Sequence, residues 1–156
     1  MKQVYLPSLP FEGGCQCGAV RYRATGTPLV FYLCHCTECQ RHTSSAFGES
    51  LRFAAEEVEI TGTISTTWRT AESGRKRFGH FCPSCGVRLL HGSEGGDEVN
   101  IKAGTLDDTA WLYPAGHIWT RSSQPFMRFG DDELVYECQP DDGYEALRER
   151  WRKMTG

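Results

Sequence analysis

The chain has 156 residues, of which 39% are hydrophobic and 24% charged, and its formal net charge is -3. This length suits one domain with a substantial core, and the composition excludes a disordered chain or a membrane protein. The acidic balance argues against a general nucleic-acid binder, because such domains carry a basic excess. The first residues lack the apolar core of a secretory signal, and we expect a cytoplasmic protein with reduced thiols.

Short strands separated by turns dominate the first two thirds of the chain. Val20 and Tyr22 alternate with Arg21 and Arg23, which is the period of a strand. Residues 29–33 form a β-rich run that leads into a short helix over residues 37–42. Further strands are expected at residues 46–53, 58–60, 64–69, 75–81, 87–91, 98–103 and 117–120. This pattern predicts a mainly β, sandwich-like or barrel-like fold.

The C-terminal region follows a helical pattern instead. Asp141 and Asp142 can cap a helix there, because a carboxylate accepts hydrogen bonds from the first free backbone amides. The apolar residues of this helix recur at helical spacing: Tyr144, Leu147, Trp151 and Met154. They predict a face that docks on the sheet. We therefore divide the chain into a main domain, residues 11–126, and an extension, residues 127–156, whose helix packs on the same domain.

Seven of the eight cysteines fall in three short clusters: Cys15 and Cys17; Cys34, Cys36 and Cys39; Cys82 and Cys85. A free cysteine behaves in a core as a small apolar residue and has no reason to cluster. A metal ion, by contrast, needs several sulfurs around one point. In a reducing compartment closely spaced thiols are more often metal ligands than disulfides, so the clusters predict metal binding.

Two clusters together offer four sulfurs. In an extended Cys15-x-Cys17 segment both side chains project from one face. Cys82 and Cys85 form a knuckle, and the following Gly86 lets the backbone fold closely around an ion. Four sulfurs make the closed tetrahedral set of a structural zinc site, which would make folding dependent on the metal.

The third cluster leaves Cys34, Cys36 and Cys39 with no obvious fourth ligand. Three protein ligands and one open position are the pattern of a catalytic zinc site. Three thiolates on a divalent cation leave a net charge of about -1, which weakens the metal as an activator of water. A soft thiolate could still take the open position, so the cluster favours a small thiol as substrate.

Other arrangements of the thiols stay open. Cys36 and Cys39 could join Cys82 and Cys85 in a zinc ribbon, an interaction module, although the 42 residues between the pairs exceed the usual roughly 15 to 20. Disulfide bonds are a further alternative, because the number of cysteines is even. Cys138, which we expect at a strand end, is more simply a partly buried thiol than a fourth ligand.

Three segments resemble the glutathione-dependent formaldehyde-activating enzyme family, also called the centromere protein V or Gfa-like family. They are residues 13–22 (GGCQCGAVRY), 34–41 (CHCTECQR) and 81–86 (FCPSCG). Residues 102–108 (KAGTLDD) and 117–119 (HIW) are similar to further signatures of the family. The likeness spans residues 11–126. The chain departs from the pattern at residues 43–45, in a loop beside the second site, and at residues 125–126, in a pocket wall.

This resemblance implies a β-rich fold shared with methionine sulfoxide reductase B domains. It implies a structural zinc on Cys15, Cys17, Cys82 and Cys85, and a second zinc on Cys34, Cys36 and Cys39. It also implies the family's activity, in which formaldehyde and glutathione condense to S-hydroxymethylglutathione, a reaction classed with the carbon-sulfur lyases. We therefore predict a lyase that acts on a small thiol and an aldehyde, with two zinc ions per chain.

Three residues are candidates for substrate binding. Arg41 can pair with a carboxylate through its planar fork, and Gln40 can hydrogen-bond an amide of a peptide-like thiol. His117 is a candidate proton carrier, although a hydrogen-bonded core histidine is the simpler explanation. Arg41 has a structural alternative as a surface or sheet-edge arginine. We expect His35 to point away from the neighbouring thiols and to bond the backbone.

Two other classes of function compete with a lyase. The protein could be a zinc-stabilised thiol-binding or interaction module without catalysis. It could also be an oxidoreductase of the sulfoxide-reductase kind, which needs a nucleophilic cysteine outside the metal set. Only Cys138 meets that requirement.

Overall fold

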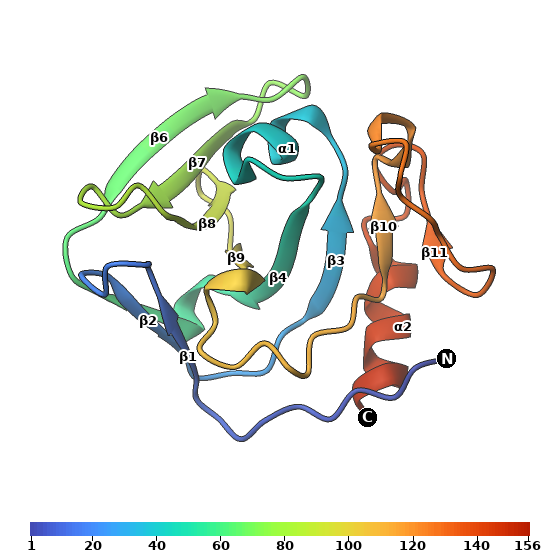
Figure 1. The fold of residues 1–156 in the computed structure, drawn as a ribbon, viewed down its shortest axis with the longest axis horizontal. Coiled ribbons are helices and arrows are strands. Elements are labelled where there is room, and N and C mark those ends of the chain that lie inside the picture. Colours follow the sequence, from blue (N-terminus) through green and yellow to red (C-terminus); the bar gives the residue numbers. More distant parts are fainter.

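The computed structural model describes residues 1–156 and contains two β-sheets and two α-helices (Figure 1). The smaller sheet has the order β1-β2-β5, with β1 at Phe11–Gly14, β2 at Arg21–Ala24 and β5 at Val58–Thr61. The larger sheet has the order β11-β10-β3-β4-β9-β8-β7-β6. Its strands are β3 (Val30–Cys34), β4 (Gly48–Ala54), β6 (Ser65–Thr70), β7 (Lys76–Phe81), β8 (Arg88–Ser93), β9 (Glu98–Lys102), β10 (Gly116–Ile118) and β11 (Leu134–Val135).

The helices are α1 (Thr37–Thr43), directly after the second cysteine cluster, and α2 (Glu145–Thr155) at the C-terminal end. Three short 3-10 turns complete the regular structure: η1 (Ala55–Glu57), η2 (Ala103–Thr105) and η3 (Thr120–Ser122). The mainly β fold, with a short helix after the cysteine loop and a C-terminal helix, is therefore confirmed. No helix has both the length and the apolar character that a bilayer span requires.

Two strands escape the sequence prediction, and one ends early. β1 (Phe11–Gly14) ends in two glycines and β11 has only two residues, so neither carries a clear strand signal. β10 ends at Ile118 and does not continue to residue 120. Trp119 adopts a left-handed conformation with φ of 59°, which turns the chain into η3.

The segment that carries Cys15 and Cys17 is a turn, so the prediction of an extended segment is wrong there. The amide of Gly18 donates to the carbonyl of Cys15 at 3.2 Å, and Gly18 has a φ of +79°. The chain must reverse between β1 and β2, which pair antiparallel, and the cysteines occupy that reversal. Their sulfurs therefore meet across a turn and not along one strand face.

The core joins the two sheets and the C-terminal helix. Its fully buried side chains include Phe31 of β3, Leu51 and Phe53 of β4, Leu89 of β8 and Ile101 of β9. The predicted alternation in β2 is confirmed, because Tyr22 is buried whereas Arg23 is exposed. The ring of Phe11 lies 6.0 Å from that of Phe53, and this contact connects the small sheet to the large one.

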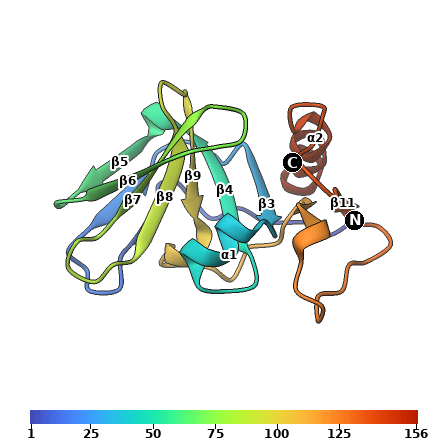
Figure 2. The ribbon, with the colours of Figure 1, turned by 90° about the horizontal axis from the view of Figure 1, so that it is seen from above.

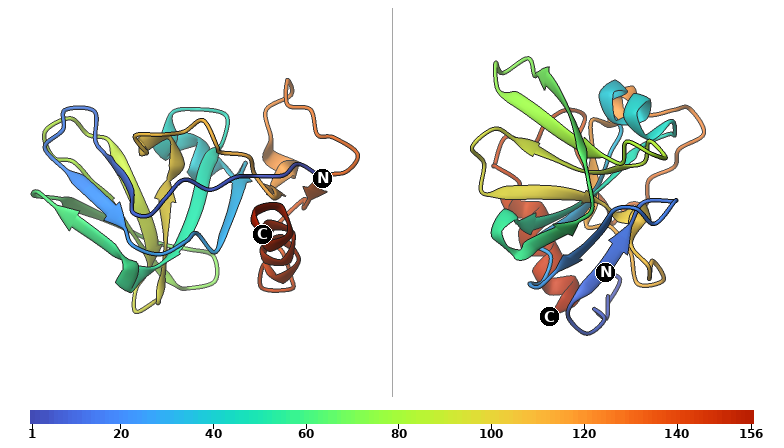
Figure 3. Two further views of the ribbon diagram at one scale, coloured as in Figure 1. Left: turned by 90° about the horizontal axis from the view of Figure 1, so that it is seen from below. Right: turned by 90° about the vertical axis from the view of Figure 1, so that its left-hand side faces the viewer.

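Helix α2 packs beside β3 through the predicted apolar face, and the N-terminal segment runs close to its end (Figures 1 and 2). Leu147, Trp151 and Met154 are buried, and Tyr144 is partly buried. The indole N–H of Trp151 donates to the carbonyl of Pro28 at 3.0 Å. The amide of Val4 donates to the carbonyl of Met154 at 2.8 Å. Figure 3 shows the N- and C-terminal ends on the same side of the molecule.

The start of α2 provides a stability prediction with a matched control. The carboxylate of Asp142 accepts from the amides of Tyr144 and Ala146, both at 3.0 Å, whereas no such bond involves Asp141. We expect Asp142→Ala to lower the free energy of unfolding by about 1 kcal/mol, the usual effect of a lost helix cap. Asp141→Ala should leave it unchanged in denaturant titrations. Equal effects of the two substitutions would contradict a stabilising role of the Asp142 carboxylate at the start of α2, where Tyr144 holds the N-cap position.

Candidate metal centres

The end of β3 and the start of α1 bring three thiols together. Cys34 is the last residue of β3, and Cys36 is the N-cap of α1, where its sulfur lies 3.3 Å from the amide nitrogen of Cys39. The sulfurs of Cys34, Cys36 and Cys39 all lie within 4.8 Å of one another. Cys36 is partly exposed, whereas Cys34 and Cys39 are buried. We call this set the three-cysteine site.

Three thiols so close cannot all ionise without a compensating cation. Hydrogen bonds from Cys34 and Cys39 lower the pKa of the Cys36 thiol, and the same bond to Cys36 raises the pKa of Cys34. One sulfur therefore takes the negative charge and its neighbours hold their protons. A bound divalent cation would remove this conflict, because thiolates are the form that ligates metals.

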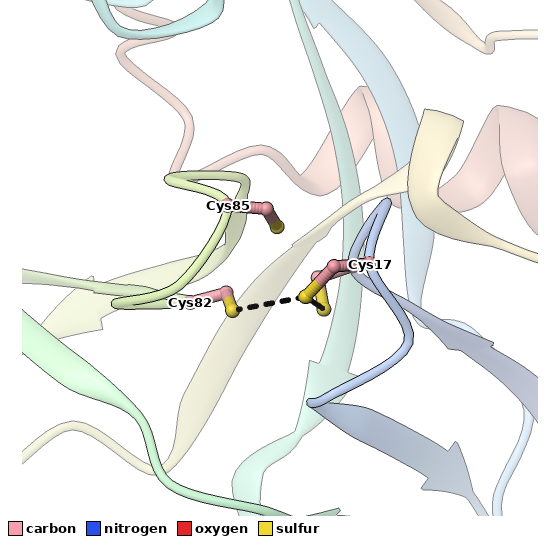
Figure 4. Close-up of side chains that lie close together, drawn as sticks. Cys17, Cys82 and Cys85 are labelled. Atoms are coloured by element: carbon pink, nitrogen blue, oxygen red, sulfur yellow. Dashed lines mark hydrogen bonds between the residues drawn. The ribbon is translucent and has the colours of Figure 1, made fainter.

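The β1–β2 turn and the β7–β8 loop form a second set, which we call the four-cysteine site (Figure 4). The sulfurs of Cys15 and Cys17 are 3.6 Å apart, and that of Cys17 lies 3.7 Å from the sulfur of Cys82. The amide of Val20 donates to the sulfur of Cys15 at 3.2 Å. Backbone amides of Val87 and Cys17 lower the pKa of the Cys85 thiol to about 6, which favours the thiolate.

Both sets fit a thiophilic metal such as zinc. A tetrahedral ion with zinc-sulfur bonds of about 2.3 Å holds its sulfurs roughly 3.8 Å apart, close to the separations in the four-cysteine site. All eight cysteines are free, so the disulfide alternative is not supported. The groups divide four and three, and Cys36 and Cys39 do not join Cys82 and Cys85, which contradicts the zinc-ribbon arrangement. Cys138 belongs to neither group. It is exposed and lies outside β11, which ends at Val135, so the expectation of a partly buried thiol at a strand end is wrong.

A basic group of side chains lies close to the three-cysteine site, and the sequence pattern did not predict it. Lys102 is buried at the end of β9, and its ammonium lies 3.4 Å from Nε2 of His42 on α1. The rings of His42 and His91 are 5.9 Å apart. Burial lowers the pKa of Lys102 to about 8, and the nearby Cys39 side chain acts in the opposite direction. Lys102 begins the segment 102–108 that resembles the family, but the strand pattern does not indicate that it is buried, so only the fold reveals this group.

An open groove runs along the exposed side of α1, beginning one residue after Cys36. Its volume is about 600 Å³, within the roughly 300–1,000 Å³ of small-molecule sites. Helix α1, the loop after it and the segment before residue 127 line this groove: Thr37, Gln40, Arg41, Ser44, Ser45, Ala46, Gln124 and Phe126. Both places where the chain departs from the family pattern, residues 43–45 and 125–126, thus contribute to the groove.

The candidate substrate-binding residues occupy different environments. Arg41 is exposed in the groove, and no hydrogen bond or ion pair within the chain occupies its guanidinium. The amide nitrogen of Gln40 instead donates to the carbonyls of His35, at 2.8 Å, and Ser122, at 2.9 Å. Its oxygen accepts from Gln124 at 3.2 Å, so the whole amide is used within the protein. This bonding joins α1 to η3.

His117 belongs to a buried pair with His35. Nδ1 of His117 and Nε2 of His35 are 3.0 Å apart, and Nε2 of His117 lies 3.6 Å from a carboxylate oxygen of Glu133. The expectation that the His35 side chain bonds the backbone is therefore wrong. The pKa of His35 is lowered to about 4, mainly by burial and to a smaller extent by the charge of the neighbouring His117. The pair connects the cysteine loop to β10 through two neutral rings.

Fold and thiol geometry define a β-rich protein with two sites able to hold thiophilic metals. The family model for the glutathione-dependent formaldehyde-activating enzymes matches residues 10–122, and the chain belongs to this family. A putative glutathione-dependent formaldehyde-activating enzyme of Halomonas elongata is 34% identical over 84 residues, which cover 50% of this chain and 53% of that protein. The matched region thus spans about half of that relative's length.

The crystal structure of a Rhodobacter sphaeroides protein has a similar fold. The alignment covers 80% of this chain and 98% of that chain, with a TM-score of 0.51 and 16% sequence identity. At this identity the likeness concerns the fold alone.

The four-cysteine site generates a prediction about metal content. Cys17→Ser removes a sulfur that lies close to those of both Cys15 and Cys82. We expect this variant to lose the metal of the four-cysteine site and several kcal/mol of unfolding free energy, because structural metal binding is coupled to folding. Elemental analysis and thermal unfolding measure both effects. Cys138→Ser, at an exposed cysteine outside both groups, is the control and should match the wild type.

Proposed function

We propose that the protein is a zinc-dependent carbon-sulfur lyase that joins a small thiol such as glutathione to an aldehyde such as formaldehyde, and catalyses the reverse cleavage. The observation that carries this proposal is the three-cysteine site, whose three sulfurs lie within 4.8 Å of one another and would supply three of the four ligands of a tetrahedral ion. The groove along α1 includes Thr37, the residue after Cys36. The family match supports the same substrate class. The reaction forms a carbon-sulfur bond, and the thiol proton ends on the former carbonyl oxygen.

Cys34, Cys36 and Cys39 would hold the ion, which would stabilise the anionic form of a substrate thiol near neutral pH. The contribution of the protein is to position the substrate thiol close to the three-cysteine site. Cys36 is the partly exposed member of the site and immediately precedes the groove, so a thiol whose remainder lies along α1 can reach it. Holding thiol and aldehyde side by side supplies the rate gain, since the addition itself is easy chemistry.

Arg41 is the groove residue best suited to a substrate carboxylate. Its guanidinium is free of internal partners and presents a planar fork, the geometry that matches a carboxylate with two parallel hydrogen bonds. Gln40, by contrast, acts in this proposal through the shape of the groove, because its amide holds α1 against η3. His117 acts through the position of His35, on the chain between Cys34 and Cys36.

The two other functions make different predictions. A thiol-binding module without catalysis would show ligand binding at the three-cysteine site and no acceleration of adduct formation. An oxidoreductase of the sulfoxide-reductase kind would depend on Cys138, which lies outside both sulfur groups. The relation of the fold to methionine sulfoxide reductase B domains stays a prediction of the family resemblance.

Cys36→Ser tests the proposed reaction. Serine can still cap α1, so this substitution removes a sulfur and keeps the local fold. We expect the wild type to accelerate exchange between formaldehyde, glutathione and their adduct, measured by exchange NMR against the uncatalysed rate. Cys36→Ser should fall to that background and lose one of two metals per chain, while the melting temperature stays within a few degrees. Cys138→Ser should retain full activity.

If the metal-loaded wild type exchanges formaldehyde, glutathione and their adduct no faster than the uncatalysed reaction, the lyase assignment is contradicted. Full exchange activity in Cys36→Ser would contradict the placement of the reaction at the three-cysteine site.

The groove yields a separate prediction about substrate recognition. We expect Arg41→Ala to raise KM for glutathione by about tenfold, the effect of losing a charge-assisted hydrogen bond of roughly 1.4 kcal/mol. KM for 2-mercaptoethanol, which has no carboxylate, should stay unchanged. Arg75→Ala, an exposed arginine in the β6–β7 turn, is the matched control. An equal change for both thiols in Arg41→Ala would argue against carboxylate pairing.

A further inference from the structure

Lys102 is a buried cation without a carboxylate partner. Only 6% of the residue is exposed, and none of the ion pairs of the molecule involves it. Its polar neighbour is Nε2 of His42, at 3.4 Å. Burying an ammonium costs free energy unless an anion compensates it. We therefore expect a negatively charged group near the ammonium of Lys102.

The surroundings of Lys102 are otherwise basic. His42, Arg88 and His91 lie around it, and Nδ1 of each histidine and Nε of Arg88 are buried without a hydrogen-bond partner. The carboxylate of Glu49 also lies in the field of Lys102, but it accepts from the amide of Gly104 and forms no ion pair with the lysine. The other groups near Lys102 that can carry negative charge are the sulfurs of the three-cysteine site, of which that of Cys39 lies close to Gly48 together with the ammonium.

Gly48 of β4 brings the lysine and the sulfurs together. It pairs with Cys34 across the sheet and has no side chain of its own. A methyl group at this position would lie 3.2 Å from the sulfur of Cys39 and 3.6 Å from the ammonium of Lys102. Both atoms thus border the same small space. The ammonium approaches the three-cysteine site from the interior, whereas the groove follows the exposed side of α1.

We propose that Lys102 is the counter-charge of the three-cysteine site and that it sets the preference of this site for an anionic fourth ligand over a neutral one. Three thiolates and a divalent cation sum to about -1, and a fourth thiolate makes the complex about -2. The ammonium offsets one of these charges. Without it, an incoming thiolate meets an uncompensated negative site, whereas a neutral ligand is little affected.

This inference deepens the proposed function, because it names Lys102 as a positioning residue that selects thiolates. It is tested without aldehyde and without turnover. The chain is loaded with Co²⁺, and 2-mercaptoethanol or imidazole is titrated at pH 7 while the cobalt absorption bands are followed. Lys102→Met should weaken binding of 2-mercaptoethanol by about tenfold or more, with imidazole binding changed by less than about threefold.

Two further variants control the experiment. Lys102→Arg keeps the positive charge and should keep the ratio of thiol to imidazole affinity within about threefold of the wild type. Lys76→Met removes an exposed lysine of β7 and should behave as the wild type. Selective loss of cobalt from the three-cysteine site in Lys102→Met, with the four-cysteine site still loaded, also supports the proposal.

An unchanged affinity ratio in a fully loaded Lys102→Met chain overturns the proposal. Where Lys102→Met unfolds and loses both metals, Lys102→Arg decides: a preserved ratio supports the counter-charge, and a lost ratio overturns it. The lyase assignment can fail independently. If Lys102→Met changes the affinity ratio but the wild type exchanges the adduct only at the uncatalysed rate, the role of Lys102 stands and the lyase assignment fails.

Discussion

The repulsion between crowded thiolates is the constraint on which the rest of this structure depends. Seven sulfurs converge at two points, and each point is stable in its ionised form only with a compensating cation. The four-cysteine site joins the β1–β2 turn to the β7–β8 loop and so connects the two sheets. The three-cysteine site joins the end of β3 to α1. Both cysteine groups therefore join segments that are separate in the fold, so metal binding at either group would also stabilise the tertiary structure.

The two sites differ in how the protein treats their charge. Backbone amides surround the four-cysteine site, where Val20 and Val87 direct N–H groups at the sulfurs of Cys15 and Cys85. The three-cysteine site instead has the buried ammonium of Lys102 nearby, and the sulfur of Cys39 and this ammonium both lie close to Gly48. Four sulfurs with amide support suit a closed structural role. Three sulfurs, one of them partly exposed, with a cation nearby suit a site that exchanges ligands.

The groove links the substrate question to the sequence departures of this chain. Ser44, Ser45 and Phe126 line it, and these residues lie where the chain differs from the family pattern. Thr43 supports the same loop, since its hydroxyl lies 2.7 Å from the carbonyl oxygen of Cys39. Changes at these positions alter the groove wall without moving the sulfurs. The thiol chemistry and the identity of the thiol can therefore vary separately.

The sequence by itself determined which thiols form groups able to hold a metal, and the class of fold, because cysteine clusters and strand alternation are local patterns that survive without tertiary contacts. It also predicted the apolar face of α2 and a carboxylate, that of Asp142, which accepts from amides at the start of this helix, although the N-cap position itself is Tyr144. The turn at Cys15 and Cys17, the pairing of His35 with His117 and the burial of Lys102 were decided only by the tertiary structure. The physical reason for the histidine pair and the buried lysine is that they depend on residues about 50 or more positions away, whose approach is fixed by sheet pairing. The cysteine turn follows from the antiparallel pairing of β1 with β2, and β1 carries no clear strand signal in the sequence.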